Sequence, residues 1–385
     1  MSEPVARKTK RNHVRLSDVH GLQRLAFDAV VGVTKIVESV HATVTGVAPP
    51  IGASRASDTS GITGFVYKSV RGVTRAVGSG ADAVFGRLAA IGGDGVSSRE
   101  REAVIAVLNG VFGDHLAVTC NPLAIEMGVR KDGGRVAVDR NALASAFAQP
   151  ARRVVVMLHG LCMNDLMWLR DGHDHGAALA RDAGFTPVYV HYDTGREIAA
   201  NGRDLDALMQ ALVDAWPAPI DRLAIVGHSM GGLVARSAIE SASRQGGTWT
   251  ARLDSLVFLG TPHLGAPLER AGAWVDYLVG ISPYTAPFAR LGKLRSAGIK
   301  DLRHGLGAQP SLPAHVRTYA IAASTQNAAG RSPARSRGDG LVPVKSALAM
   351  SMPASHRYIV YGTGHLELLA SRAAYERMRR WIARR

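Results

Sequence analysis

Residues 223–232, Leu-Ala-Ile-Val-Gly-His-Ser-Met-Gly-Gly, are the stretch of the chain best suited to covalent chemistry. The centre fits the pattern Gly-x-Ser-x-Gly, in which Gly227 and Gly231 flank Ser229. An apolar run precedes this pattern and a helical pattern follows at once, so the order is strand, sharp turn, helix. This order predicts a nucleophile elbow, which strains the serine backbone and exposes its hydroxyl at the end of the sheet. A glycine-rich turn that binds nothing is the structural alternative.

A serine hydroxyl needs a neighbouring base, and the base needs an acid that orients it. In chains with this elbow the order is serine, then acid, then histidine. Asp339 stands between two glycines after a predicted strand, and His365 follows a Gly-Thr-Gly turn after the last predicted strand. We therefore expect Asp339 to be the orienting acid and His365 the general base. Glu367 is the fallback acid, and an Asx turn is the structural alternative for Asp339.

Two backbone amides are expected to stabilise an oxyanion. The N–H of Met230 lies at the predicted start of a helix, where it faces developing negative charge. The N–H of Leu161 follows the flexible Gly160 in the loop after a strand at 154–158. Cys162 is next to this loop but lacks an elbow, so we do not expect it to be a nucleophile.

Other residues near these motifs are candidates for a substrate pocket. His263 follows a Gly-Thr-Pro turn, and it is a poor candidate for the base because it precedes Asp339 in the chain. His228 is expected to pack beside the elbow. The expected pocket residues are His263, Leu264, Trp274 and Tyr277. No cofactor is expected, since the histidines and acids do not have the spacing of metal ligands.

The elements that must position these residues alternate between strand and helix from Arg153 onwards. Strands are predicted at 154–158, 186–192, 223–226, 256–259, 316–322 and 357–361, and helices at 205–216, after Ser229 and at 370–382. A β-hairpin is predicted around residues 131–134. Repeated strand–helix units indicate an α/β fold with a mostly parallel sheet and helices on both faces. Residues 263–313 have no clear strand pattern, and we interpret them as a helical cap over the site.

The N-terminal part of the chain has a different character. We expect a basic flexible tail over 1–19, an amphipathic helical region over 20–115 and a hydrolase domain over 116–385. Helical patterns begin at His20 and run again over 62–88, where the polar face is basic. A capping box at Ser97-x-x-Glu100 predicts a third helix. An antiparallel helical hairpin is the simplest arrangement, and use at an anionic membrane or granule surface is the functional alternative.

Composition limits the class of protein. The chain has 385 residues, is 46% hydrophobic and carries a formal net charge of +15. Its two cysteines form no framework, and we see neither a signal peptide nor an apolar run long enough to span a membrane. We therefore expect a cytoplasmic protein. The positive charge favours anionic partners. An arginine-rich composition without such a partner is the simpler explanation of this charge. A nucleic-acid partner is not expected, because no motif supports one.

Residues from about 120 to 385 resemble the α/β-hydrolase superfamily, in particular its lipase and esterase branch and the GPI inositol-deacylase-like group. The motifs that carry the resemblance are Leu158-His-Gly-Leu161, Gly227-His-Ser-Met-Gly231, Gly260-Thr-Pro-His-Leu-Gly265, Gly338-Asp-Gly-Leu-Val-Pro343 and Gly364-His365. Tyr192-Asp-Thr-Gly195 with Asn201-Gly202 also resembles a segment of bacterial members of that group. The resemblance implies a triad of Ser229, Asp339 and His365. The N-terminal region matches no part of a hydrolase.

These features predict a serine hydrolase of carboxylic esters that acts through an acyl-enzyme. The apolar cap and the amphipathic N-terminal region favour an acyl-chain or lipid-like ester. An acyltransferase or an intracellular polyester depolymerase would use the same triad. A membrane- or granule-associated binding protein with a vestigial hydrolase fold is the alternative from another class.

Overall fold

The computed structural model of the chain describes residue 15, residues 17–28, residue 31, and residues 97–266, 277, 281, 296–305, 312–327, 338–349 and 352–383. The chain divides into two compact units. The smaller comprises Met1–Gly95 with Val118–Leu123, and the larger comprises Val96–Ala117 with Ala124–Arg385. The predicted basic tail and the amphipathic stretch over 62–88 lie almost entirely outside the described residues.

In the smaller unit, the first helix is described over residues 17–28. It begins before His20, because the Arg15 amide donates to the Asp18 carboxylate (2.8 Å) in the manner of a capping box. Arg24 from this helix donates to the carbonyl oxygens of Thr119 (2.6 Å) and Cys120 (3.0 Å). These bonds attach the helix to the segment over 118–123.

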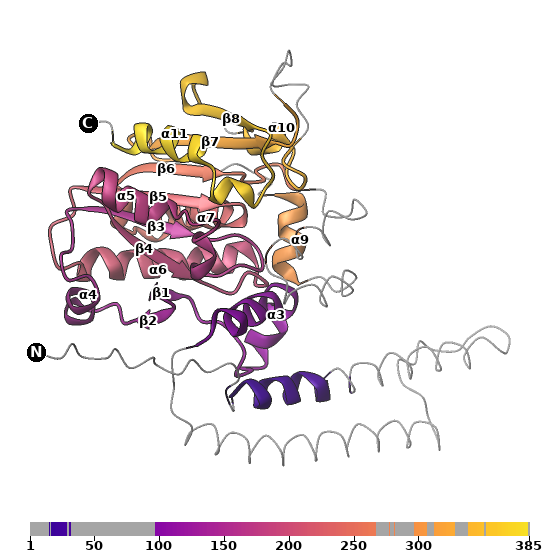
Figure 1. Ribbon diagram of the computed structural model, residues 1–385. Helices are drawn as coiled ribbons and strands as arrows, with labels where there is room; N and C mark the ends of the chain where they lie inside the picture. Colours follow the sequence, from indigo (N-terminus) through magenta and orange to yellow (C-terminus); the bar gives the residue numbers. More distant parts are fainter. Residues whose placement is uncertain are drawn as a thin grey trace, which may run out of the picture. The chain divides into compact units, whose positions relative to one another are not determined.

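The larger unit is built on one sheet of eight strands in the order β2-β1-β4-β3-β5-β6-β7-β8 (Figure 1). The strands are β1 (Gly128–Lys131), β2 (Gly134–Val136), β3 (Arg153–Leu158), β4 (Thr186–His191), β5 (Arg222–His228), β6 (Leu253–Leu259), β7 (Arg317–Ser324) and β8 (Arg357–Tyr361). The sheet is parallel from β4 to β8, whereas β1 pairs antiparallel with both β2 and β4. The predicted hairpin and the mostly parallel sheet are thereby confirmed.

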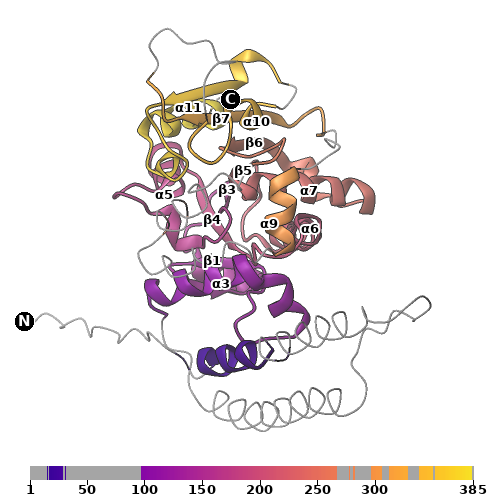
Figure 2. The same cartoon turned by 90° about the vertical axis from the view of Figure 1, so that its right-hand side faces the viewer.

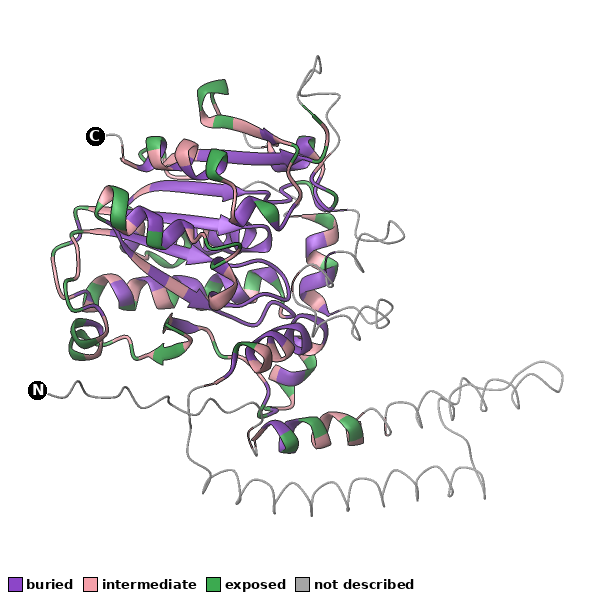
Figure 3. Ribbon diagram, in the orientation of Figure 1, coloured by how far each residue is buried: buried purple, intermediate pink, exposed green. Residues whose placement is uncertain are grey.

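Helices cover both faces of this sheet, as expected (Figure 2). One face carries α5 (His175–Ala183) and α11 (Arg372–Ala383), and the other carries α6 (Ile198–Ala215) and α7 (Met230–Gln245). The central strands are buried on both sides, as Figure 3 shows, which explains why β3 and β5 are continuous apolar runs in the sequence. Within the part of the chain that the structure describes, every helix is too short or too polar to cross a membrane.

The remaining helices and 3-10 turns complete the described part of the larger unit. They are α3 (Arg99–Val118), α4 (Arg140–Ala146), α9 (Ala297–His304), α10 (Val344–Ala347) and the 3-10 turns η1 (Asp165–Trp168), η2 (Trp249–Arg252), η5 (Ala354–His356) and η6 (Glu367–Leu369). The capping box predicted at Ser97 is wrong by one residue. It is the Ser98 hydroxyl that accepts from the Arg101 amide (3.2 Å), whereas the Ser97 hydroxyl accepts from the Arg101 guanidinium.

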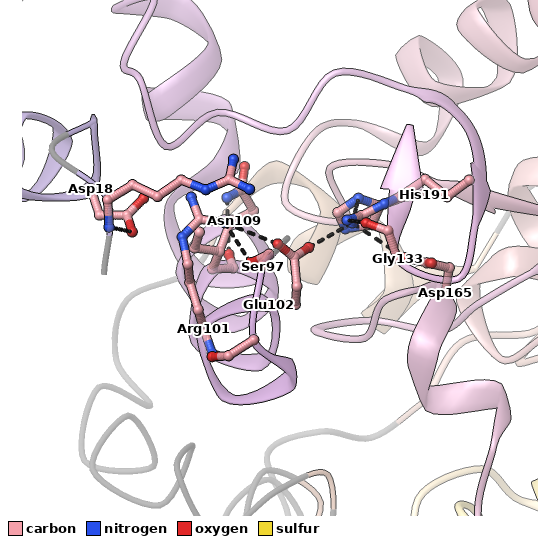
Figure 4. Close-up of polar contacts among 12 residues, drawn as sticks. Asp18, Ser97, Arg101, Glu102, Asn109, Gly133, Asp165 and His191 are labelled. Atoms are coloured by element: carbon pink, nitrogen blue, oxygen red, sulfur yellow. Dashed lines mark hydrogen bonds and ion pairs between the residues drawn. The ribbon is translucent and has the colours of Figure 1, made fainter. Parts of the chain in front are cut away.

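Helix α3 is attached to the sheet by buried charges (Figure 4). The Arg130 guanidinium on β1 lies 2.6 Å from the Glu102 carboxylate on α3, 3.3 Å from the Asp165 carboxylate on η1 and 2.9 Å from Nδ1 of His191 on β4. Burial raises the pKa of Asp165 to about 6. Because one guanidinium is shared among three elements, it fixes α3 against the sheet and against the segment that follows the β3 loop.

The same helix also packs closely against two loops at the carboxyl ends of strands. A Cβ on Gly110 would lie 2.2 Å from Sγ of Cys162, and one on Gly113 would lie 1.8 Å from the Asp193 carboxylate. Only glycine permits these approaches. Residues of α3 up to 117 thus belong to the compact unit that contains the sheet, while the domain boundary proposed near residue 116 stays a prediction.

Candidate active site

The predicted elbow is present between β5 and α7. Ser229 has φ 52° and ψ −122°, a region that a residue with a side chain rarely adopts, and its amide donates to the Leu259 carbonyl (2.8 Å). A Cβ on Gly227 would lie 2.5 Å from the Gly232 nitrogen, and one on Gly231 would lie 2.4 Å from the Leu158 oxygen. Both glycines are therefore required by the turn, as the sequence predicts.

The candidate base and acid are in contact. Nδ1 of His365 lies 2.7 Å from Oδ2 of Asp339, and both side chains are buried. Oδ1 of Asp339 accepts from the amides of Leu341 (3.0 Å) and Val342 (2.7 Å). The Asx turn and the orienting role therefore coexist, one on each carboxylate oxygen. Nδ1–H of His365 donates to the Asp339 carboxylate, so the lone pair of the neutral imidazole lies on Nε2. A general base needs this lone pair to accept the serine proton.

The loop after β6 joins this pair to the elbow. Gly260 has φ 58°, and a Cβ there would lie 3.2 Å from Cε1 of His365 and 3.3 Å from Oδ2 of Asp339. From the elbow, His228 approaches the carbonyl oxygen of His365 with Nε2 at 3.2 Å. Oγ of Ser229 and Nε2 of His365 are both buried, and within the described residues neither has a hydrogen-bond partner. The structure thus pairs His365 with Asp339 and places the His365 backbone beside the elbow that carries Ser229, without a hydrogen bond between serine and imidazole.

The candidate oxyanion donors lie beside the elbow. Met230 is the first residue of α7, so its N–H has no acceptor within the helix. In the loop after β3, Cys162 N–H donates to the Thr194 hydroxyl (3.0 Å) and Met163 N–H donates to the Gly160 carbonyl (3.2 Å). The Leu161 amide has no hydrogen-bond acceptor among the described residues, so it is a candidate donor to an anion. A Cβ on Gly160 would lie 3.1 Å from Cβ of Ser229, which places the loop against the nucleophile.

His159 controls the orientation of that loop. Its Nε2 accepts from the Tyr192 amide (3.4 Å), so Nδ1 carries the proton and donates to the Gly160 carbonyl (3.0 Å). Burial lowers the pKa of His159 to about 4, so the ring is neutral at neutral pH. Since carbonyl and amide point in opposite directions across one peptide plane, holding the Gly160 carbonyl also fixes the Leu161 N–H.

Two further imidazoles support the loop that carries the candidate base. His175 lies 2.9 Å through Nε2 from the Leu368 carbonyl, and its Nδ1 lies 2.9 Å from Nε2 of His173. Because a carbonyl only accepts, Nε2 of His175 is the donor, and Nδ1 then accepts from His173. Burial lowers the pKa of His175 to about 4. His228 and His175 thus hold the loop that carries His365, by hydrogen bonds to the carbonyl oxygens of His365 and Leu368.

The expected pocket residues have different surroundings. Tyr277 is buried, donates its hydroxyl to the Leu161 carbonyl (2.6 Å) and lies with its ring centroid 5.9 Å from that of His365. Leu264 is 53% exposed, whereas His263 is fully buried and lies against Arg236. Trp274 and most of the predicted cap lie outside the described residues, so the pocket stays a prediction.

The alternative nucleophile, Cys162, and the alternative acid, Glu367, do not have the contacts that these roles require. Cys162 is buried, and burial raises the pKa of its thiol, which disfavours the reactive thiolate. The carboxylate of Glu367 accepts from the Gly364 amide, whereas Asp339 contacts the imidazole. The side chains of His159, His175 and Arg236 were missed by the sequence reasoning. His159 alone had a signal, because it precedes the glycine of the predicted oxyanion loop.

Comparison with known proteins gave one partial family match and several distant structural likenesses. The domain of unknown function DUF7379 matches residues 135–307, and no curated protein matches the sequence significantly. A mature Bacillus licheniformis lipase is 17% identical, with a TM-score of 0.41 over 57% of this chain and 88% of its own. A Thermogutta terrifontis esterase is 17% identical (TM-score 0.38, 60% and 90%), and Aspergillus fumigatus lipase B is 15% identical (TM-score 0.38, 63% and 57%). The chain has an α/β-hydrolase fold, an assignment that rests on its sheet and its elbow.

Proposed function

We propose that the protein is a serine hydrolase of carboxylic esters. The observation that carries the proposal is the strained Ser229, φ 52°, at the same edge of the sheet as the buried His365–Asp339 pair. A backbone strain of this kind costs of the order of 1–3 kcal/mol and is retained at functional sites. A bare glycine-rich turn would not need a paired imidazole and carboxylate beside it.

In the proposed reaction Ser229 Oγ attacks the acyl carbon and its proton passes to Nε2 of His365. Asp339 holds the imidazole by Nδ1 and stabilises the imidazolium that forms. The amides of Leu161 and Met230 stabilise the oxyanion, and His365 then protonates the leaving alcohol. Water hydrolyses the acyl-enzyme by the same steps in reverse order.

The proposed substrate is an acyl-chain or lipid-like ester. The apolar character of the 263–313 segment supports this class, as does Tyr277, which lies between the oxyanion loop and His365. We also propose that the chain is related to the GPI inositol-deacylase-like group and that it makes peripheral contact with an anionic surface. Activity that fell steadily with acyl length and never responded to anionic vesicles would contradict it.

The first experiment compares the full chain with the Ser229→Ala variant on short p-nitrophenyl esters. We expect kcat to fall by about 10⁴-fold or more, because the nucleophile is lost. Ser237→Ala, on the same helix, is the matched control and should retain activity. A Ser229→Ala protein as active as wild type would overturn the mechanism.

A second experiment separates the enzyme from a binding protein with a vestigial fold. A fluorophosphonate probe should label wild type and fail to label Ser229→Ala. Product analysis with an added alcohol then separates hydrolysis from acyl transfer. Failure of the probe to label the folded wild-type protein would favour the binding protein.

A further inference from the structure

Arg236 is a fully buried cation on α7, about two turns beyond the elbow. Burial lowers the pKa of its guanidinium to about 10, so it remains charged at neutral pH. A charge removed from water is costly unless it is paired and hydrogen-bonded. The contacts of Arg236 therefore decide whether the structure compensates it.

Among the described residues, this side chain has one hydrogen bond, and its partner is an imidazole. Nη1 of Arg236 lies 3.0 Å from Nδ1 of His263. A guanidinium cannot accept, so Nδ1 of His263 is the acceptor and the ring proton lies on Nε2. Burial lowers the pKa of His263 to about 3, so this partner is neutral. The carboxylate of Glu240, one turn further along α7, attracts Arg236 electrostatically, but its hydrogen bond goes to Arg244.

The opposite edge of the guanidinium is unused. Nε and Nη2 of Arg236 are buried, and among the described residues neither has a hydrogen-bond partner. Their N–H bonds point in the same direction and match the spacing of two oxygens of a carboxylate or phosphate. Because His263 engages the other side of the plane, the orientation of this fork is fixed.

We propose that the Nε/Nη2 edge of Arg236 binds a small oxyanion, a carboxylate or a phosphate group, through two parallel hydrogen bonds. The anion supplies the two missing acceptors and a negative charge in direct contact with the guanidinium. His263 acts as the anchor that orients the fork. The site is separate from the Ser229–His365–Asp339 constellation, and the inference does not depend on the proposed function.

The experiment measures the thermal unfolding midpoint of the full chain, because a ligand that binds only the folded state raises this midpoint as its concentration rises. Sodium phosphate, acetate and chloride are compared at equal ionic strength and pH 7. We expect phosphate, acetate or both to raise the midpoint above its value in chloride, which lacks paired oxygens. A response to phosphate alone identifies a phosphate site, and a response to acetate alone identifies a carboxylate site.

Two variants test the fork itself. Arg236→Lys keeps the charge but loses the planar edge, so the oxyanion response should disappear. Arg236→Met removes both, and in chloride it should be no less stable than wild type. Arg203→Met removes an exposed charge from α6 and should keep the full response, which controls for general binding to a basic protein.

An oxyanion response of equal size in wild type and Arg236→Lys would overturn the inference, as would a wild-type midpoint that is the same in all three salts. Should Arg236→Met fail to fold, Arg236→Lys and His263→Phe remain decisive. The latter removes the anchor and should weaken the response.

Discussion

The Nδ1–H of His159 donates over 3.0 Å to the carbonyl oxygen of Gly160, which shares a peptide group with the candidate oxyanion donor, the Leu161 N–H. The ring stacks on Tyr192, with centroids 4.5 Å apart, and its tautomer is set by the Tyr192 amide. His159 is therefore a positioning residue for Leu161 in the proposed reaction.

His159→Phe should lower kcat by about 10- to 100-fold with little change in KM, less than the loss of a whole oxyanion donor. The aromatic ring retains the stacking and loses only the hydrogen bonds. His159→Asn, which keeps a donor near Nδ1, should recover part of the loss. Steady-state kinetics on p-nitrophenyl esters measures both, and equal kcat values for His159→Phe and wild type would contradict the role.

His175→Phe should loosen the loop that carries His365, because the Leu368 carbonyl loses its donor. We expect kcat to fall about 10-fold and the amides of residues 363–370 to exchange faster with deuterium. His175→Gln retains a donor at the position of Nε2 and should restore both properties. Deuterium exchange does not depend on activity. Unchanged protection of these amides in His175→Phe would therefore show that His175 does not hold the loop, whether or not the protein hydrolyses esters.

The parallel sheet was predictable because β3 and β5, at its centre, are buried on both faces and appear as apolar runs. The elbow was predictable because Gly227 and Gly231 are needed within a few residues of Ser229, a requirement that is entirely local. Asp339 and His365 followed from their places after strands. Parallel strands bring their carboxyl ends to one edge of the sheet, so the position along the chain implies proximity.

Other features depend on contacts that the sequence does not encode locally. His175 meets Leu368 across 193 residues of chain, and nothing near His175 indicates this partner. Arg236 looks like one more polar residue on an amphipathic helix. Helix α5 was missed although Asp174 caps its start and Gly184, at φ 66°, ends it, because its apolar pattern is short.

Stability should rise with pH between about 4.5 and 6.5. Burial lowers the pKa of His159, His175 and His263 to about 4, 4 and 3, against about 6.5 in an unfolded chain. In this range the unfolded chain binds protons that the folded chain does not, so the free energy of unfolding falls as pH falls. Each ring contributes roughly 3 to 5 kcal/mol over its full titration, since one pKa unit is about 1.4 kcal/mol.

Two buried carboxyls act in the opposite direction. Burial raises the pKa of Asp165 to about 6 and that of Asp193 to about 7, so their contribution falls as pH rises above about 4. The histidines outnumber them, so the net slope should stay positive. Urea unfolding at pH 4.5, 5.5 and 6.5 measures this slope of the free energy of unfolding. His175→Phe should reduce the slope. His304→Gln, at an exposed position, is the control and should leave the slope unchanged. A protein more stable at pH 4.5 than at pH 6.5 would show that these rings are protonated in the folded state.

Gly110→Ala should reveal how α3 supports the oxyanion loop. The new Cβ would lie 2.2 Å from Sγ of Cys162, the residue after Leu161. Overpacking of this kind costs about 1–3 kcal/mol, and relief by movement of Cys162 would also displace the Leu161 amide. We therefore expect a lower urea midpoint and a lower kcat.

Cys162→Ala removes the clashing sulfur and should restore much of both losses when it is combined with Gly110→Ala. The double-mutant cycle should give a coupling energy of about 1 kcal/mol or more, as for side chains in direct contact. The exposed Cys120→Ala is the matched control and should not couple. Strictly additive effects of Gly110→Ala and Cys162→Ala would mean that α3 does not act on the oxyanion loop through this contact.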